Sequence, residues 1–366
     1  MLIAFVLFIS LILYGLFEYK NHRKNIEKIP LRILVNGTRG KTTVTRLITY
    51  SLMEKGIKTV SRTSGSSLEI IHSDGSVEKI ERKRKARILE MLPFFSLAAK
   101  EGAEAVVVEC MALEEENQRV MRDTLVRPNI VVITNTFIDH VPQMGKTQGE
   151  TAWCLSRSVP KDAILYTTDN LYDDFGFKVK RVDYSNTNAP TSSSIPIHPS
   201  SWALSQKVLE DLGINEDIMN IAKDKIPPDI GLLKEIKGEN GSILIPSFSV
   251  NDKECMAMTI REEIDKHPTL KPIIVFNNRK DREHRIKLLK EVLMEWEEEK
   301  RPMVEIIGEY KGKVSFYFNR RGIEAFPSSV EDLAERIGNE RDTLFIGVGN
   351  IKGDGEKLMA SLMEEN

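Results

Sequence analysis

The feature that most constrains the fold is a glycine-rich segment between a predicted strand and a predicted helix. Residues 32–36 form an apolar run typical of a buried strand. Residues 42–55 carry apolar side chains at helical spacing, and Gly56 stands where such a helix would end. Because the segment follows a strand, we expect it at the carboxyl edge of a sheet, where open α/β folds bind ligands. It consists of Gly37, Thr38, Arg39, Gly40, Lys41, Thr42 and Thr43.

The residue types in this segment suit a phosphate group. Glycines let backbone N–H groups curve around phosphate oxygens, and the start of the following helix adds its dipole. We expect Lys41 to reach the β- and γ-phosphates of a nucleotide and the Thr42 hydroxyl to bind Mg²⁺. Val35 stands where the strict Walker A pattern has glycine, so a turn that merely caps the helix is the alternative. The strand–loop–helix context favours the nucleotide and predicts ATP and Mg²⁺ as cofactors.

The start of the chain has the properties of a membrane anchor. Leu2 to Phe17 contains no charged residue, and basic residues follow from Lys20. Its length lies near the lower limit of the roughly 17–25 residues that span a bilayer. A cleaved signal peptide is the alternative, but Glu18-Tyr19-Lys20 follows the run in place of a small-residue cleavage site. We predict a single-pass anchor in the cell membrane over residues 1–18, a basic linker over 19–30 and a cytoplasmic catalytic body.

Strand and helix patterns alternate along the rest of the chain. Further buried strands are predicted at 57–60, 105–110 and 129–134, and hairpins at 69–80 and 235–246. A second series of strands and helices follows. This alternation predicts an α/β fold with mostly parallel sheets. We divide it into a phosphate-loop (P-loop) domain over 31–246 and a Rossmann-like C-terminal domain over 247–366.

Charge and cysteine content exclude several functions. The chain of 366 residues has 52 basic and 54 acidic residues, a net charge of −2. Without a basic excess, we predict no nucleic-acid partner. Cys110, Cys154 and Cys255 are scattered and form no CxxC pair, which argues against a disulfide framework and a zinc site.

Two further residues are candidate metal ligands. Glu109 ends a strand of three valines, where an unpartnered carboxylate would be costly unless a cation balanced it. The alternative is a carboxylate just past the strand and exposed to water. His140 follows Thr134 and Asn135 beyond another buried strand, and it is either a ligand or a structurally satisfied histidine.

These motifs together resemble the Mur ligase superfamily, whose members couple ATP hydrolysis to amide-bond formation. The shortened loop at 37–43, the strand ending in Glu109 and the segment 133–140 occur in the family's order. The resemblance implies a Mur-ligase-like P-loop domain, with Mg²⁺ bound by Thr42, Glu109 and His140 and ATP contacts from Asn135. Many Mur ligases also carry a carbamylated lysine past the histidine, whereas Cys154 to Ser158 contains no lysine. Details of a second metal site are therefore open.

Within the superfamily, the chain resembles the membrane-anchored ligase subunits of poly-γ-glutamate synthase, with the anchor in place of a UDP-binding domain. The resemblance implies that glutamate is added to a growing poly-γ-glutamate chain through an acyl phosphate. Lys41, Arg39, Glu109 and His140 would be the catalytic residues, with Arg39 either neutralising the transferred phosphoryl group or holding the acceptor carboxylate. Membrane-bound synthase or export subunits are the implied partners.

Several further positions have two possible roles. The family places substrate or ribose contacts near Asn251 and Asp252, which otherwise simply cap a helix. Arg279 follows a buried strand, at an edge that favours ligands. The basic run 82–87 is either a solvated helix face or a contact for anionic headgroups or polyglutamate, and the loop 63–67 is either an acceptor site or a plain turn. The alternative functions are a membrane-tethered regulatory NTPase and a folylpolyglutamate-synthase-like ligase that acts on a small acceptor.

Overall fold

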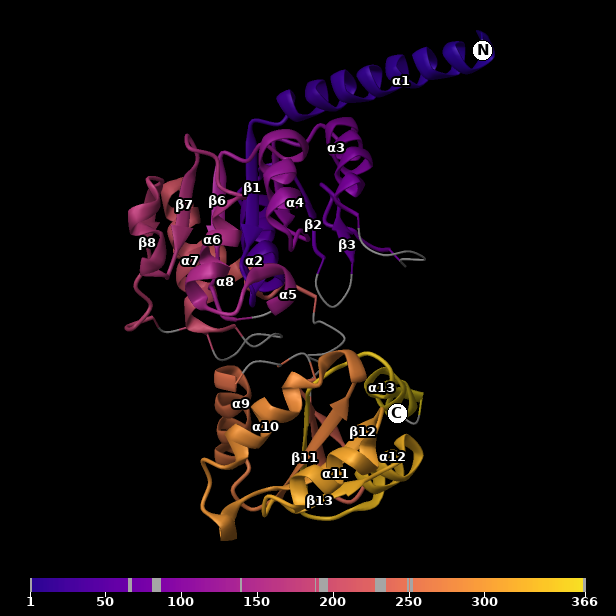
Figure 1. Ribbon diagram of the computed structural model, residues 1–366. Coiled ribbons are helices and arrows are strands. Elements are labelled where there is room, and N and C mark those ends of the chain that lie inside the picture. The colour runs from indigo at the N-terminus through magenta and orange to yellow at the C-terminus, as the bar shows by residue number, and fades with distance from the viewer. Residues whose placement is uncertain are drawn as a thin grey trace. The chain divides into compact units, whose positions relative to one another are not determined.

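The chain folds into two compact units, residues 1–226 and 227–366, and each is built on its own sheet (Figure 1). The computed structural model describes residues 2–64, 68–80, 87–138, 140–187, 189–190, 197–227, 235–248, 250 and 253–364. The predicted ligands Asn251 and Asp252 lie outside these ranges. So do residues 65–67 of the predicted loop and 82–86 of the basic run.

An eight-stranded sheet forms the centre of the first unit, within the described residues, in the order β4-β3-β2-β5-β1-β6-β7-β8. Strands β2, β5, β1, β6, β7 and β8 are parallel, and the β3–β4 hairpin adds an antiparallel edge. The strands are β1 (Leu31–Asn36), β2 (Thr59–Arg62), β3 (Glu69–Ile71), β4 (Val77–Lys79), β5 (Ala105–Glu109), β6 (Ile130–Ile133), β7 (Ile164–Thr167) and β8 (Lys178–Arg181).

Helices cover both faces of this sheet. One apolar core lies under α2, α7 and α8, and the other lies under α3, the α4–η2 segment and α6. Val44, Leu47, Ile48 and Leu52 of α2 are all fully buried, as their helical spacing predicts. The helical elements after the first helix are α2 (Lys41–Glu54), η1 (Ile88–Glu90), α3 (Met91–Lys100), α4 (Glu115–Val120), η2 (Met121–Leu125), α5 (Val141–Met144), α6 (Gln148–Ser156), η3 (Asn170–Phe175), α7 (Pro199–Asp211) and α8 (Glu216–Lys223).

The first helix, α1 (Leu2–Glu27), continues well past the apolar run. Its apolar part is exposed and long and apolar enough to cross a membrane (Figure 1). The prediction of a linker over 19–30 is wrong for most of this stretch, because His22 and Ile26 are buried against the first unit and keep the chain helical. Helix α1 packs on α3.

The second unit contains a six-stranded sheet, counted over the described residues, in the order β13-β12-β11-β14-β10-β9. All neighbouring strands are parallel except β9 and β10, which form the predicted hairpin. Helices α9, α10 and α11 cover one face, and α12 and α13 the other. The elements are β9 (Ile236–Lys237), β10 (Ile243–Pro246), α9 (Lys253–Lys266), β11 (Lys271–Asn278), η4 (Lys280–Arg282), α10 (His284–Leu293), η5 (Glu298–Lys300), β12 (Met303–Gly308), α11 (Lys311–Asn319), β13 (Ala325–Pro327), α12 (Val330–Asn339), β14 (Thr343–Val348) and α13 (Asp354–Glu364).

The α/β class with mostly parallel sheets is confirmed, whereas the division between the units differs from the one expected. The structure places it after residue 226, and the sequence suggested residue 246. Strand β10 is the reason, because it pairs in parallel with β14 and brings its hairpin partner β9 into the second sheet.

Candidate active site

The phosphate loop lies at the carboxyl edge of the first sheet, as the sequence predicts. It follows β1, which is flanked by β5 and β6, and the register pairs Val35 with Glu109 and Asn36 with Ile133. Residues that follow the ends of these three strands therefore share one edge. This arrangement brings the loop, Glu109 and the Thr134–Asn135 segment together from three separate parts of the sequence.

Two glycines in the loop have positive φ angles, which glycine adopts far more readily than other residues. Gly37 has φ of +121° and Gly40 has φ of +75°. A Cβ atom on Gly37 would lie 2.2 Å from Thr134 Oγ1, and one on Gly40 would lie 2.9 Å from Ser201 Oγ. The loop backbone thus passes so close to its neighbours that no side chain fits at Gly37.

Thr134 and Asn135 hold the loop in this conformation. Asn135 Oδ1 accepts hydrogen bonds from the Thr38 hydroxyl at 2.6 Å and the Arg39 N–H at 3.1 Å. The Arg39 carbonyl accepts from Thr134 Oγ1 at 2.5 Å and from Asn135 Nδ2 at 3.1 Å. Asn135, predicted as an ATP contact, therefore acts on the loop itself. Its side chain fixes the backbone that would surround a phosphate.

The Lys41, Thr42 and Glu109 side chains surround the start of α2. Lys41 Nζ donates to the Gly37 carbonyl at 2.8 Å, so its ammonium lies against the loop. Thr42 Oγ1 donates to Glu109 Oε2 at 2.9 Å, and the Ser64 N–H donates to the same oxygen at 2.9 Å. Glu109 is only 1% exposed. The carboxylate and hydroxyl predicted as metal ligands are thus adjacent, one of them buried.

The chemistry of this pair fits Mg²⁺ bound together with phosphate oxygens. Mg²⁺ typically keeps several waters and takes one or two protein carboxylates plus substrate phosphates. Within the described ranges, no group of three or more His, Cys, Asp or Glu side chains is arranged to hold a metal ion by itself. His140 is half-buried at the start of α5, with φ of +48°. The structure brings together Thr42 and Glu109, and His140 as a further metal ligand stays a prediction.

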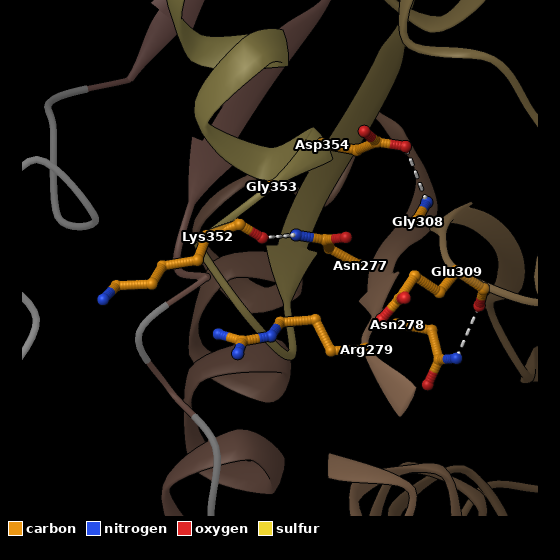
Figure 2. Close-up of a pocket in the computed structure, with 8 residues that line it drawn as sticks. All are labelled: Asn277, Asn278, Arg279, Gly308, Glu309, Lys352, Gly353 and Asp354. Carbon is orange, nitrogen blue, oxygen red and sulfur yellow. Dashed lines mark hydrogen bonds between the residues drawn. The ribbon is translucent and has the colours of Figure 1, made fainter. Parts of the chain in front are cut away.

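A separate pocket of about 440 Å³ lies in the second unit (Figure 2). It occupies the carboxyl edge of β11, β12 and β14 and contains Arg279, the remaining predicted contact. Figure 2 shows Arg279 and Lys352 extending to the same side, with the Asp354 carboxylate on the other side beside Gly308. The lining residues are Asn277, Asn278, Arg279, Gly308, Glu309, Lys352, Gly353 and Asp354.

This pocket combines two fixed amide side chains with two cations. Asn277 and Asn278 are 1% and 2% exposed, and within the described structure no donor reaches either Oδ1 atom. Their Nδ2 atoms are fixed, because Asn277 donates to the Lys352 carbonyl at 3.0 Å and Asn278 to the Glu309 carbonyl at 2.6 Å. Arg279 is paired with Asp281 at 2.8 Å. Two cations and an acidic side chain, Asp354, in one pocket suit a ligand that carries both carboxylates and an ammonium group.

Sequence reasoning missed two residues, Asn36 and Gln118, whose hydrogen bonds hold the start of the loop. Asn36 is 2% exposed at the end of β1, and its Oδ1 accepts the Gly37 N–H at 2.8 Å. Gln118 on α4 is fully buried and accepts from Asn36 Nδ2 at 2.8 Å. The available signal was a polar residue at the end of an otherwise apolar strand, directly before the loop. Its partner on α4 has no local signature.

Two protein families match the chain in different regions. The Mur ligase middle domain matches residues 35–186, which include the phosphate loop and Glu109. The poly-gamma-glutamate synthase CapB C-terminal domain matches residues 233–365, which include the pocket of the second unit.

Relatives also match over nearly the full length. The PGA synthase CapB of Bacillus subtilis (strain 168) is 30% identical over 97% of this chain and 95% of its own. The capsule biosynthesis protein CapB of Bacillus anthracis is 29% identical over 98% of this chain and 82% of its own. A bifunctional folylpolyglutamate synthase/dihydrofolate synthase from Yersinia pestis, solved with AMPPNP and Mn ion, shares the fold. It has a TM-score of 0.70 at 13% identity and covers 94% of this chain and 91% of its own.

The matched domain and the fold define the class of protein. This is a Mur-type ligase, an enzyme that forms amide bonds at the expense of ATP. Because the chain is 30% identical to a PGA synthase CapB over nearly its full length, it belongs to the CapB family of poly-γ-glutamate synthases.

Proposed function

We propose that the protein is an ATP- and Mg²⁺-dependent ligase that joins glutamate residues through their γ-carboxyl groups. The observation that carries the proposal is the phosphate loop beside the buried Glu109 carboxylate and the Thr42 hydroxyl that donates to it. It occurs in a chain that matches a PGA synthase over 95% of that protein's length. The substrates would be ATP, glutamate and the end of a growing poly-γ-glutamate chain.

The proposed reaction has two steps. In the first, a γ-carboxylate oxygen of the acceptor forms a bond to the γ-phosphorus of ATP, and the bond to the bridging oxygen breaks, which releases ADP and leaves an acyl phosphate. In the second, the amine of the incoming glutamate attacks the acyl carbon, loses a proton to solvent, and displaces inorganic phosphate. Little covalent chemistry is left to the protein in such phosphoryl transfer, so positioning and charge neutralisation dominate.

The residues of the loop have distinct roles in this scheme. Lys41 would leave its contact with the Gly37 carbonyl and neutralise charge on the β- and γ-phosphates. Thr42 and Glu109 would hold Mg²⁺, which supplies further positive charge at the transferred phosphoryl group. Arg39 stands in the loop, where its guanidinium would pair with the acceptor carboxylate or with the phosphoryl group.

The pocket of the second unit is the proposed site for the incoming glutamate. The Asp354 carboxylate would pair with the ammonium group. Arg279 and Lys352 would pair with the carboxylates. A volume of about 440 Å³ is ample for an amino acid.

The proposed location is the cell membrane, with the ligase units in the cytoplasm. The exposed apolar part of α1 supports the membrane site, and the basic residues after it support this orientation. An anchored ligase would deliver its product directly to membrane-bound synthase or export subunits, which we propose as partners.

Steady-state ADP release tests the proposal. With Mg-ATP and a short poly-γ-glutamate acceptor, we expect ADP release to depend on glutamate and to be abolished by Lys41→Ala, with the thermal unfolding midpoint unchanged within a few degrees. ADP release that ignores glutamate would instead support a regulatory NTPase. Full activity of the Lys41→Ala variant would refute the phosphate-loop assignment.

A further inference from the structure

A helical segment with one buried face connects the docked end of α1 with the phosphate loop. This segment consists of α4 (Glu115–Val120) and the π-helical turn η2 (Met121–Leu125), which continues it without a break. Met121 and Leu125 are buried in the same apolar core as Ile26 and Ile29. The η2 end of the segment therefore packs against the end of the anchor helix. The α4 end contacts the residue that precedes the phosphate loop.

At the loop, the contact runs through two buried amides. Gln118 Oε1 accepts from Asn36 Nδ2 at 2.8 Å, and Ser158 Oγ accepts from the same nitrogen at 3.0 Å. These two acceptors fix the orientation of the Asn36 amide, so that its Oδ1 faces the Gly37 N–H at 2.8 Å. Gln118 is held in turn by its Nε2 contact with Cys154 Sγ at 3.5 Å. The position of Gly37 is thus set by a chain of contacts that starts on α4.

At the other end, the contact is made by α1. His22 is 3% exposed, and its Nε2 lies 3.1 Å from the Leu125 carbonyl, the last residue of η2. The His22 ring also packs edge-on against Phe95 of α3, with 5.5 Å between the ring centroids. Ile26, one helical turn further along, is 1% exposed. The end of the anchor helix is therefore fixed to η2 by both a hydrogen bond and apolar packing.

We propose that the α4–η2 segment couples the docked end of the anchor helix to the phosphate loop, with Gln118 and Asn36 as positioning residues for ATP. The inference rests on the proposed role of the loop as the ATP site. The contacts of this segment at Gln118, Met121 and Leu125 lie in the close-packed interior, which transmits small displacements because it does not deform continuously. A displacement of α1 in the membrane would then change the position of Gly37, and with it the affinity for ATP.

Kinetics of the full-length protein in lipid vesicles test the loop end of this connection. Gln118→Met keeps the length of the side chain and removes the acceptor for Asn36 Nδ2. We expect the KM for ATP to rise about tenfold, the effect of one lost buried hydrogen bond, while kcat at saturating ATP changes less than about twofold. Ser158→Ala removes the other acceptor and should shift the KM for ATP in the same direction. Asn117→Ala, the neighbouring position whose side chain bonds Glu114 at the surface, is the matched control.

The anchor end is tested with His22→Phe, which keeps an aromatic ring against Phe95 and removes the hydrogen bond to Leu125. We expect the KM for ATP to rise about threefold in this variant, with displacement of a fluorescent ATP analogue as a second measurement. An unchanged KM for ATP in His22→Phe would overturn the coupling, and an unchanged KM in both Gln118→Met and Ser158→Ala would overturn the positioning role. Either result leaves the proposed function intact as long as Lys41→Ala abolishes ADP release.

Discussion

Replacing Gly37 with alanine tests whether the close approach of the loop to Thr134 is required for ATP binding. Two costs follow from the structure. Alanine at φ of +121° strains the backbone by about 1–3 kcal/mol. Its Cβ would also lie 2.2 Å from Thr134 Oγ1 and 2.9 Å from the Thr134 backbone nitrogen, against an ordinary contact of 3.4–4 Å. The loop or Thr134 must therefore move by about 1 Å, which is enough to reduce activity roughly 100-fold.

Gly56→Ala is the matched control for the strain. Gly56 follows the other end of the same helix with φ of +87°, and a Cβ there would meet no atom within 4 Å. We expect both variants to lose about 1–3 kcal/mol of unfolding free energy to backbone strain, with a further loss in Gly37→Ala from the clash with Thr134, measured by denaturant titration. Only Gly37→Ala should lose kcat/KM for ATP, by about 100-fold in the ADP-release assay. If the two variants kept equal kcat/KM values, the close approach would have no role in the reaction.

Three further predictions concern other sites. Glu109→Gln keeps an acceptor for Thr42 but removes the negative charge. We therefore expect ADP release to fall about 10²–10³-fold and to require a higher Mg²⁺ concentration. An unchanged Mg²⁺ titration would exclude this carboxylate as a metal ligand. Arg279→Ala should raise the KM for glutamate at least about tenfold and leave the KM for ATP unchanged, whereas the reverse pattern would assign Arg279 to the nucleotide. The hydrogen bond with Glu101 raises the pKa of His72. Protonated His72 therefore stabilises the folded protein below about pH 6.5, and this stabilisation is lost as pH rises through the folded-state pKa. The difference in Tm between wild type and His72→Asn should therefore be larger at pH 6 than at pH 9, and a difference that grew with pH would contradict the assignment.

The phosphate loop and Glu109 could be predicted because their signals are local. Glycine, lysine and threonine at fixed spacing after an apolar strand indicate a phosphate site, and three valines before a glutamate indicate a strand end. The hydrogen-bonded brace could not be predicted in the same way. Asn36 and Gln118 are 82 positions apart, and their contact depends on how α4 packs across the sheet. Asn135 was found from its motif, but its contacts with the loop backbone required the register of β1 and β6.

The two differences in the fold also have physical causes. The charge-rich stretch after the apolar run predicts a linker, but the helix continues to Glu27, with His22 and Ile26 buried on one face. The hairpin at 235–246 was predicted correctly but assigned to the first domain. Its place depends on the pairing of Ile243 with Leu344, a contact between distant parts of the sequence.

Trapping the acyl phosphate tests the central claim most directly. The full-length protein in lipid vesicles would be incubated with Mg-ATP, a short poly-γ-glutamate and hydroxylamine, which converts an acyl phosphate into a hydroxamate. We predict a γ-hydroxamate that forms in proportion to ADP and is absent with Lys41→Ala. ADP release that requires the acceptor but yields no hydroxamate would contradict the acyl-phosphate route, and ADP release without any need for an acceptor would contradict the ligase itself.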